Sequence, residues 1–140
     1  MNVFQWLRYG PWLAQVVVTR RCNLKRGYCT EYDRTSDPAP YDELALRLAK
    51  LAELRAWAVC LTGGEPTMHP RLPDLVAEMK RLSFKRRMLI TNGWRLTSAL
   101  IDLLNRTVRA CQECDAGAGW TLTGSNRADV GSISLRSGTW

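Results

Sequence analysis

The feature that most constrains the fold of this 140-residue chain is an alternation of short apolar runs with amphipathic helical stripes. One run, over residues 13–19, contains three consecutive valines, and similar runs cover residues 57–62 and 87–91. Uninterrupted apolar runs of this length are typical of strands buried on both faces. Strands that alternate with helices predict parallel pairing through right-handed crossovers. The predicted fold class is therefore α/β, with about three strand–helix units.

Three helices are predicted from apolar residues that recur every three or four positions. Asp42 is expected to cap the first helix and Thr97 the third. The predicted buried stripes consist of Leu44, Leu48, Leu51 and Leu54; of Leu72, Leu75, Val76, Met79 and Leu82; and of Leu100, Ile101 and Leu104.

The first strand leads into the stretch TRRCNLKRGYCTEYDR, residues 19–34, which is typical of an iron–sulfur cluster loop. Cys22 and Cys29 stand at the first and third positions of a C-x3-C-x2-C pattern, and Arg26 occupies the middle position. A loop this compact is too tight for a typical pair of zinc-finger ligands.

Two further motifs follow the next two predicted strands. Leu61-Thr62-Gly63-Gly64-Glu65-Pro66 ends the second strand, and Thr91-Asn92-Gly93 ends the third. In parallel sheets of this kind, functional loops gather at the C-terminal ends of the strands. All three motifs are therefore expected to converge on one rim.

Taken together, residues 19–29, 61–66 and 89–93 resemble the radical S-adenosylmethionine (SAM) superfamily, and most closely the branch that includes the molybdenum-cofactor biosynthesis protein A. The resemblance covers roughly residues 16–104. It implies the N-terminal part of a parallel (β/α)6 partial TIM-type barrel and a [4Fe–4S] cluster held by three cysteines. It also implies an enzyme that reductively cleaves SAM to a 5′-deoxyadenosyl radical, with an unidentified substrate and a reductant such as a flavodoxin or ferredoxin.

The same resemblance assigns roles to individual residues. Cys22 and Cys29 would ligate iron, and Tyr28 would lie beside the SAM adenine. Glycines at the second motif allow the backbone to approach closely, so that this turn could receive the SAM ammonium group. The implied SAM-binding residues are Tyr28, Gly63, Gly64, Glu65, Pro66 and Asn92.

Arg26 is the departure from the family pattern. A guanidinium stays protonated and offers no lone pair, so it cannot replace a thiolate ligand. Our hypothesis is that this chain is an impaired copy that binds a cluster poorly or not at all. The alternative is a non-catalytic binding module that keeps residues 63–66 and docks a partner through its exposed strand edges.

The periodic pattern stops after Asn105. We therefore predict a radical SAM core over residues 1–106 and an irregular or disordered tail over residues 107–140. A second hypothesis holds that the tail, from about Thr107, is out of frame, so that the C-terminal half of the barrel is missing.

Composition favours a globular protein, with 46% hydrophobic and 24% charged residues. Neither a membrane span nor a signal peptide is predicted. Five cysteines without such a signal indicate a reducing, cytoplasmic location. The net charge of +7 is scattered, and its densest group (residues 80–87) is interpreted as a helix C-terminus rather than a nucleic-acid site.

Weaker signals have plain structural explanations. His69 is interpreted as a loop residue near a helix start, and the pair Cys111 and Cys114 as a chance pair rather than a zinc site. Cys22 and Cys29 could also be ordinary buried thiols, and Glu65 could simply cap a turn.

Overall fold

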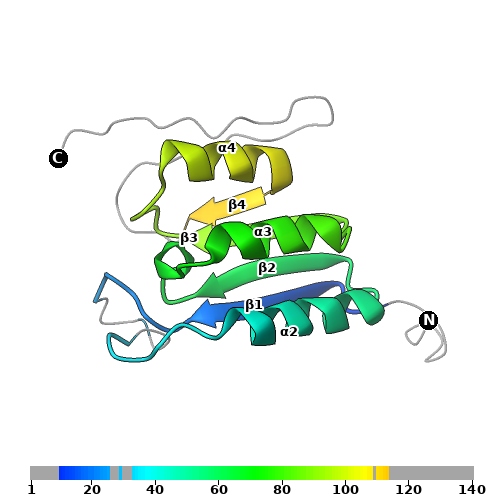
Figure 1. Ribbon diagram of the computed structural model, residues 1–140, viewed down its shortest axis with the longest axis horizontal. Coiled ribbons are helices and arrows are strands. Elements are labelled where there is room, and N and C mark those ends of the chain that lie inside the picture. The colour runs from blue at the N-terminus through cyan, green and yellow to red at the C-terminus, as the bar shows by residue number, and fades with distance from the viewer. Residues whose placement is uncertain (1–9, 26–28, 30–32, 109, 114–140) are drawn as a thin grey trace.

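The computed structural model describes residues 10–25, 29, 33–108 and 110–113, with backbone only for the last four. These residues form one parallel sheet in the order β1-β2-β3-β4. Figure 1 shows the strands running in the same direction, each of the first three followed by a helix. The elements are β1 (Leu13–Thr19), α2 (Tyr41–Glu53), β2 (Ala58–Gly63), the 3-10 turn η1 (Pro66–Met68), α3 (Leu72–Arg81), β3 (Arg86–Thr91), α4 (Ser98–Thr107) and β4 (Ala110–Glu113).

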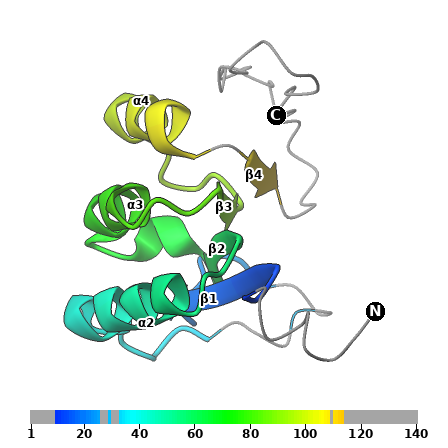
Figure 2. The ribbon, with the colours of Figure 1, turned by 90° about the vertical axis from the view of Figure 1, so that its right-hand side faces the viewer.

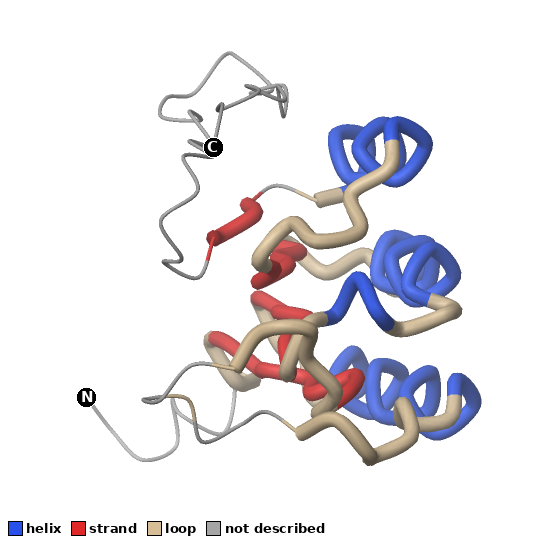
Figure 3. Tube along the Cα trace, turned by 90° about the vertical axis from the view of Figure 1, so that its left-hand side faces the viewer, coloured by secondary structure: helices blue, strands red, loops and turns tan. Residues whose placement is uncertain are grey.

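Sequential strand order is the arrangement expected at the start of a barrel. Figures 2 and 3 show α2, α3 and α4 side by side against one face of the sheet. The predicted α/β class and the partial-barrel architecture are confirmed.

The core lies between the sheet and these helices. Alternation along β1 sends Val16 and Val18 toward the helices, while Val17 on the opposite side is 39% exposed. Most residues of the predicted apolar stripes face these valines from the helices, and together they form a close-packed layer. Its fully buried members include Leu44, Leu48, Leu61, Leu72, Leu75, Val76, Met79, Leu89 and Leu104.

The end of β1 carries a bulge that matters for the rim. The pairing passes from Val17 opposite Thr62 to Thr19 opposite Gly63, so Val18 is the extra residue. The Val18 carbonyl instead accepts a hydrogen bond from Ala39 N (3.1 Å), just before α2. The bulge thereby turns the chain out of the sheet at the point where the cysteine loop begins.

Two details of the predicted helices are wrong and one is confirmed. Pro40, not Asp42, occupies the N-cap position of α2, and Asp42 lies in the first turn, where its charge favours the helix dipole. Leu54 follows the end of α2 and is 56% exposed, so it does not join the buried stripe. Thr97 does cap α4, because its hydroxyl accepts a hydrogen bond from Leu100 N (3.3 Å).

The irregular tail predicted from residue 107 is wrong at its beginning. Helix α4 runs to Thr107, and β4 then pairs with β3 in parallel, with Leu89 opposite Cys111. The strand was not predicted because Ala110-Cys111-Gln112-Glu113 contains no β-branched or aromatic residue. Residues 114–140 lie outside the described part of the chain.

No helix among the described residues is long and apolar enough to cross a membrane.

Candidate functional site at the C-terminal rim of the sheet

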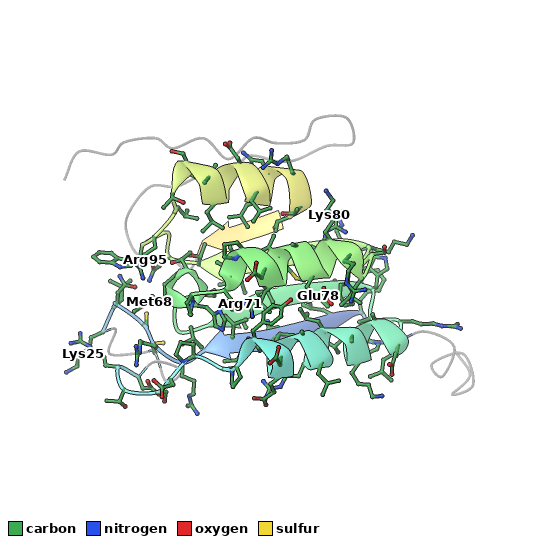
Figure 4. All side chains as sticks on the ribbon, viewed as in Figure 1. Lys25, Met68, Arg71, Glu78, Lys80 and Arg95 are labelled. Carbon is green, nitrogen blue, oxygen red and sulfur yellow. The ribbon has the colours of Figure 1, made fainter. Side chains whose placement is uncertain are left out.

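The three sequence motifs meet at the C-terminal end of the sheet, as predicted. The cysteine loop leaves β1, the turn at residues 63–66 leaves β2, and Asn92 follows β3. Hydrogen bonds join all three segments directly. In Figure 4, Lys25, Met68 and Arg95 mark this end of the sheet, and Lys80 marks the opposite end.

The glycine pair of the second motif fits against the backbone that opens the cysteine loop. Gly64 N donates to Thr19 O (2.8 Å), and Glu65 N donates to Arg21 O (2.9 Å). A Cβ at Gly63 would lie 2.1 Å from the Thr19 oxygen, and one at Gly64 would lie 2.4 Å from the Arg20 oxygen. Gly63 also has φ +143°, which side chains rarely tolerate. The close approach predicted for these glycines is therefore an approach to the protein's own backbone.

The Glu65 carboxylate is completely buried and accepts four hydrogen bonds. Its Oε1 receives Thr67 N (3.0 Å), the Thr67 hydroxyl and the Thr91 hydroxyl. Its Oε2 receives Asn92 N (2.6 Å). A buried carboxylate needs such donors to offset its lost hydration. Glu65 thus caps the η1 turn and also ties the end of β2 to the end of β3.

Asn92 connects the end of β3 to the cysteine loop. Its Nδ2 donates to Asn23 Oδ1 (2.9 Å) and lies 3.9 Å from Cys22 Sγ. Its Oδ1 accepts from Trp94 N (3.0 Å). The predicted rim position of Asn92 is confirmed by these contacts, and its first partner is another side chain of the protein.

The base of the cysteine loop is closed by backbone hydrogen bonds. Cys22 N donates to Asp33 O (3.1 Å), and Asp33 N donates to Arg20 O (2.9 Å). The Asp33 carboxylate also accepts from Ser36, through hydroxyl and backbone, and from Thr35 N (3.1 Å). Hydrogen bonds from Ser36 hold the pKa of the Asp33 carboxyl below its usual value.

Two thiols of the loop belong to the described residues. Cys22 is 9% exposed, and its Sγ accepts from Leu24 N (3.4 Å). Cys29 is half-buried, and both are free thiols. Arg26 and Tyr28, the predicted departure and the predicted adenine neighbour, lie outside the described residues.

A three-thiolate cluster site does not fit the donors that are described. No group of three histidine, cysteine or carboxylate side chains close enough to hold a metal occurs within the described ranges. The sequence gives the same result, because the middle position of the loop pattern is Arg26, which has no lone pair to offer a metal. The described rim supplies two of the three expected ligands, Cys22 and Cys29.

Neither His69 nor Cys60 can serve as the third cluster ligand. Both ring nitrogens of His69 are engaged, Nε2 with Ala39 O (2.9 Å) and Nδ1 with Arg71 N (3.1 Å). His69 is therefore the loop residue near a helix start that was predicted. Cys60 lies within β2 and is 1% exposed, and burial raises the pKa of its thiol to about 11. A protonated, buried thiol is a poor metal ligand.

The basic group over residues 80–87 lies partly at the predicted helix end and partly at the start of β3. Lys80 and Arg81 occupy the last turn of α3, and Arg81 pairs with Glu78. Arg87 donates to Thr107 O (2.5 Å) and Phe84 O (2.6 Å). These contacts engage two of the positive side chains within the fold, and the absence of a nucleic-acid site stays a prediction.

A comparison with protein families agrees with this rim. The model of the radical SAM superfamily matches residues 16–112. The chain belongs to the radical SAM superfamily. The match ends at residue 112, within β4, and the hypothesis of a shifted reading frame in the tail stays a prediction.

Curated relatives confirm the predicted resemblance to the molybdenum-cofactor branch of this enzyme family. A GTP 3',8-cyclase of Synechococcus elongatus is 32% identical over 123 residues, covering 81% of this chain and 38% of that protein. The molybdenum cofactor biosynthesis protein 1 of Drosophila melanogaster is 34% identical over 95 residues, covering 64% and 17%. A PqqA peptide cyclase of Streptomyces rochei is 31% identical over 118 residues, covering 79% and 32%. The chain thus spans less than two fifths of the length of these relatives.

A solved structure supports the architecture. SuiB of Streptococcus suis, bound to S-adenosylmethionine, superposes with a TM-score of 0.65 at 18% identity, covering 76% of this chain and 26% of that protein. At this identity the likeness establishes the fold.

Sequence reasoning missed the residues that join the three motifs. Asn23, Thr67, Thr91 and Asp33 were given no role of their own, although each makes a hydrogen bond that fixes part of the rim. Three of them directly follow or precede a predicted site residue, and this adjacency was the available signal.

Proposed function

We propose that this chain carries the cluster-and-SAM end of a radical SAM barrel, and that Arg26 leaves it unable to hold a stable [4Fe–4S] cluster. The observation that carries the proposal is the donor set: two loop thiols, and no third ligand near them among the described side chains. In the family, a cluster with one open iron supplies the electron that cleaves SAM. An impaired cluster would therefore abolish radical formation while leaving the fold in place.

The residues proposed for SAM are those at the rim. Gly63, Gly64, Glu65, Pro66 and Asn92 remain proposals for this role, as does Tyr28. For the five described residues, support comes from their position at the end of the sheet where Asn92 lies beside Cys22. The Glu65 carboxylate is saturated by internal donors. An ammonium group would therefore have to compete with internal donors for the lone pairs of this side chain.

A reducing, cytoplasmic setting and a small electron-transfer protein as reductant belong to the same proposal. The setting is proposed from the cysteine content of the chain, and the reductant from the family to which the chain belongs.

Anaerobic reconstitution with iron and sulfide tests the proposal. We expect the chain to retain well below one iron per molecule, whereas Arg26→Cys should approach about four and absorb near 400 nm, because thiolates hold such clusters. Arg26→Ser is the matched control, since it removes the guanidinium without adding a thiolate. About four irons in the unmodified chain, together with SAM cleavage under reductant, would contradict the proposal.

The competing function is a non-catalytic binding module. This function would be favoured if the Arg26→Cys variant folded like the parent but remained colourless after reconstitution.

A further inference from the structure

Asn92 is held in a single orientation by three hydrogen bonds. Its side-chain oxygen accepts from Trp94 N (3.0 Å), so the amide nitrogen must face the other way, toward Asn23 Oδ1 (2.9 Å). Its backbone N–H donates to Glu65 Oε2 (2.6 Å). The hydrogen bond from Trp94 N identifies the oxygen of the Asn92 amide, because a backbone N–H can only donate and a carboxamide oxygen can only accept.

Cys22 lies at the far end of this chain of contacts. Asn23, the acceptor for Asn92, is the next residue after Cys22, and the Asn92 amide nitrogen lies 3.9 Å from the Cys22 sulfur. The same sulfur accepts from Leu24 N (3.4 Å). On the other side, Cys22 N donates to Asp33 O (3.1 Å).

The support beneath Asn92 is a buried carboxylate. Glu65 is 0% exposed, and it comes from the turn whose backbone also holds Arg21. A buried, fully hydrogen-bonded carboxylate moves little, because shifting it would leave several donors without a partner. The turn after β2 therefore fixes the end of β3, and the end of β3 fixes the cysteine loop.

We infer that Asn92 is a positioning residue for Cys22, acting through its hydrogen bond to Asn23, and that Glu65 is a positioning residue for Asn92. All of these contacts are between groups of the polypeptide itself. The inference goes beyond the proposed function, since it holds whether or not the chain keeps a cluster.

The test is the limiting alkylation rate of each cysteine thiolate in iron-free protein, taken from a pH profile with iodoacetamide and resolved by peptide mass spectrometry, so that a change in thiolate fraction is separated from a change in positioning. Asn92→Asp keeps the oxygen that accepts from Trp94 N but replaces the donor toward Asn23 with a second acceptor. We expect Cys22 to react about fivefold faster in this variant, as the loss of one hydrogen bond implies. The rate at Cys29 should change less than twofold, because Asn92 does not contact it in the described structure.

A matched control comes from the other partner. Asn23→Asp retains an oxygen that can accept from the Asn92 amide, so its Cys22 rate should stay within about twofold of the parent. Asn105→Ala, near the far end of α4, controls for a substitution away from the rim and should leave the Cys22 rate unchanged.

Cys60 provides an internal reporter of unfolding, because it is 1% exposed and reacts only if the sheet opens. If Asn92→Asp exposes Cys60 as well, Asn23→Ala replaces it as the test, since it removes the acceptor and leaves Glu65 untouched. A parent-like Cys22 rate in whichever variant keeps Cys60 protected would overturn the inference. A selective rise at Cys22 would establish it.

Discussion

The apolar layer and the rim of this sheet are stabilised in different ways. Between the sheet and helices α2, α3 and α4, aliphatic side chains such as Leu61 and Leu75 fill space, and many sequences of similar volume would serve. At the rim, each contact is a hydrogen bond or a backbone approach that requires one residue type. The layer sets the fold of the chain, whereas the rim sets the relative positions of three loops.

The largest loss of stability is expected at Gly63, where the rim has no room for a side chain. Gly63→Ala would place a Cβ 2.1 Å from the Thr19 oxygen at a φ of +143°. Overpacking and backbone strain together should lower the free energy of unfolding by about 4 kcal/mol. Urea denaturation followed by circular dichroism measures the loss. Thr62→Ala, one residue earlier on β2, is the control, and an equal loss in both variants would refute the steric explanation.

A smaller effect is expected in the apolar layer. Leu61 is fully buried, and Leu61→Ala should cost about 3 kcal/mol through lost burial and the cavity that remains. Leu46→Ala on the exposed side of α2 should change the same free energy by less than about 0.5 kcal/mol. The hydrogen bonds of the rim should remain in place in Leu61→Ala, so the alkylation rate of Cys22 should not change. If Leu61→Ala also accelerated alkylation of Cys22 at temperatures where the chain is folded, the layer and the rim would not be separable.

The smallest change in the free energy of unfolding is expected with pH, through the buried Cys60 thiol on β2. Because the Cys60 thiol has a pKa of about 11 in the folded chain and 9.0 as its ordinary value, the unfolded state loses its proton first as pH rises. The thiol's contribution to stability is therefore fully present below pH 9 and falls as pH rises toward 11. Between pH 9 and 10 the free energy of unfolding should decrease by about 1 kcal/mol from this group. Cys60→Ala should remove that part of the slope, and an unchanged slope would show that the thiol is not buried in solution.

Sequence periodicity predicted the layer well. The run at residues 13–19 became β1 with the expected bounds, and the stripes of α3 and α4 became buried faces, because burial follows directly from the spacing of apolar residues. Prediction failed where spacing carries no signal. Strand β4 has no strand-forming residues and forms because β3 offers an unpaired edge, and α2 begins after Pro40 rather than at Asp42.

The position of the rim was predicted, but its individual hydrogen bonds were not. Topology alone brings three strand ends together, so the meeting of Cys22, Glu65 and Asn92 could be predicted. Which atoms would pair could not be, because Glu65 reaches Thr91 and Asn92 across the sheet, at a separation of more than twenty residues in sequence. Such long-range pairs depend on the bulge at Val18 and on the tight turn at Gly63, and neither can be located from residue spacing.

The closed base of the cysteine loop has an evolutionary consequence. Since Arg20 and Cys22 are hydrogen-bonded to Asp33, the chain leaves the sheet and returns to it at nearly the same point. The insert between Cys22 and Asp33 can therefore change while this base stays closed, provided that Asn23 keeps its hydrogen bond to Asn92 at the end of β3. Selection on ligand chemistry could then relax while selection on the scaffold continued. For the same reason, the whole insert is the natural unit to transplant from a relative with three cysteines.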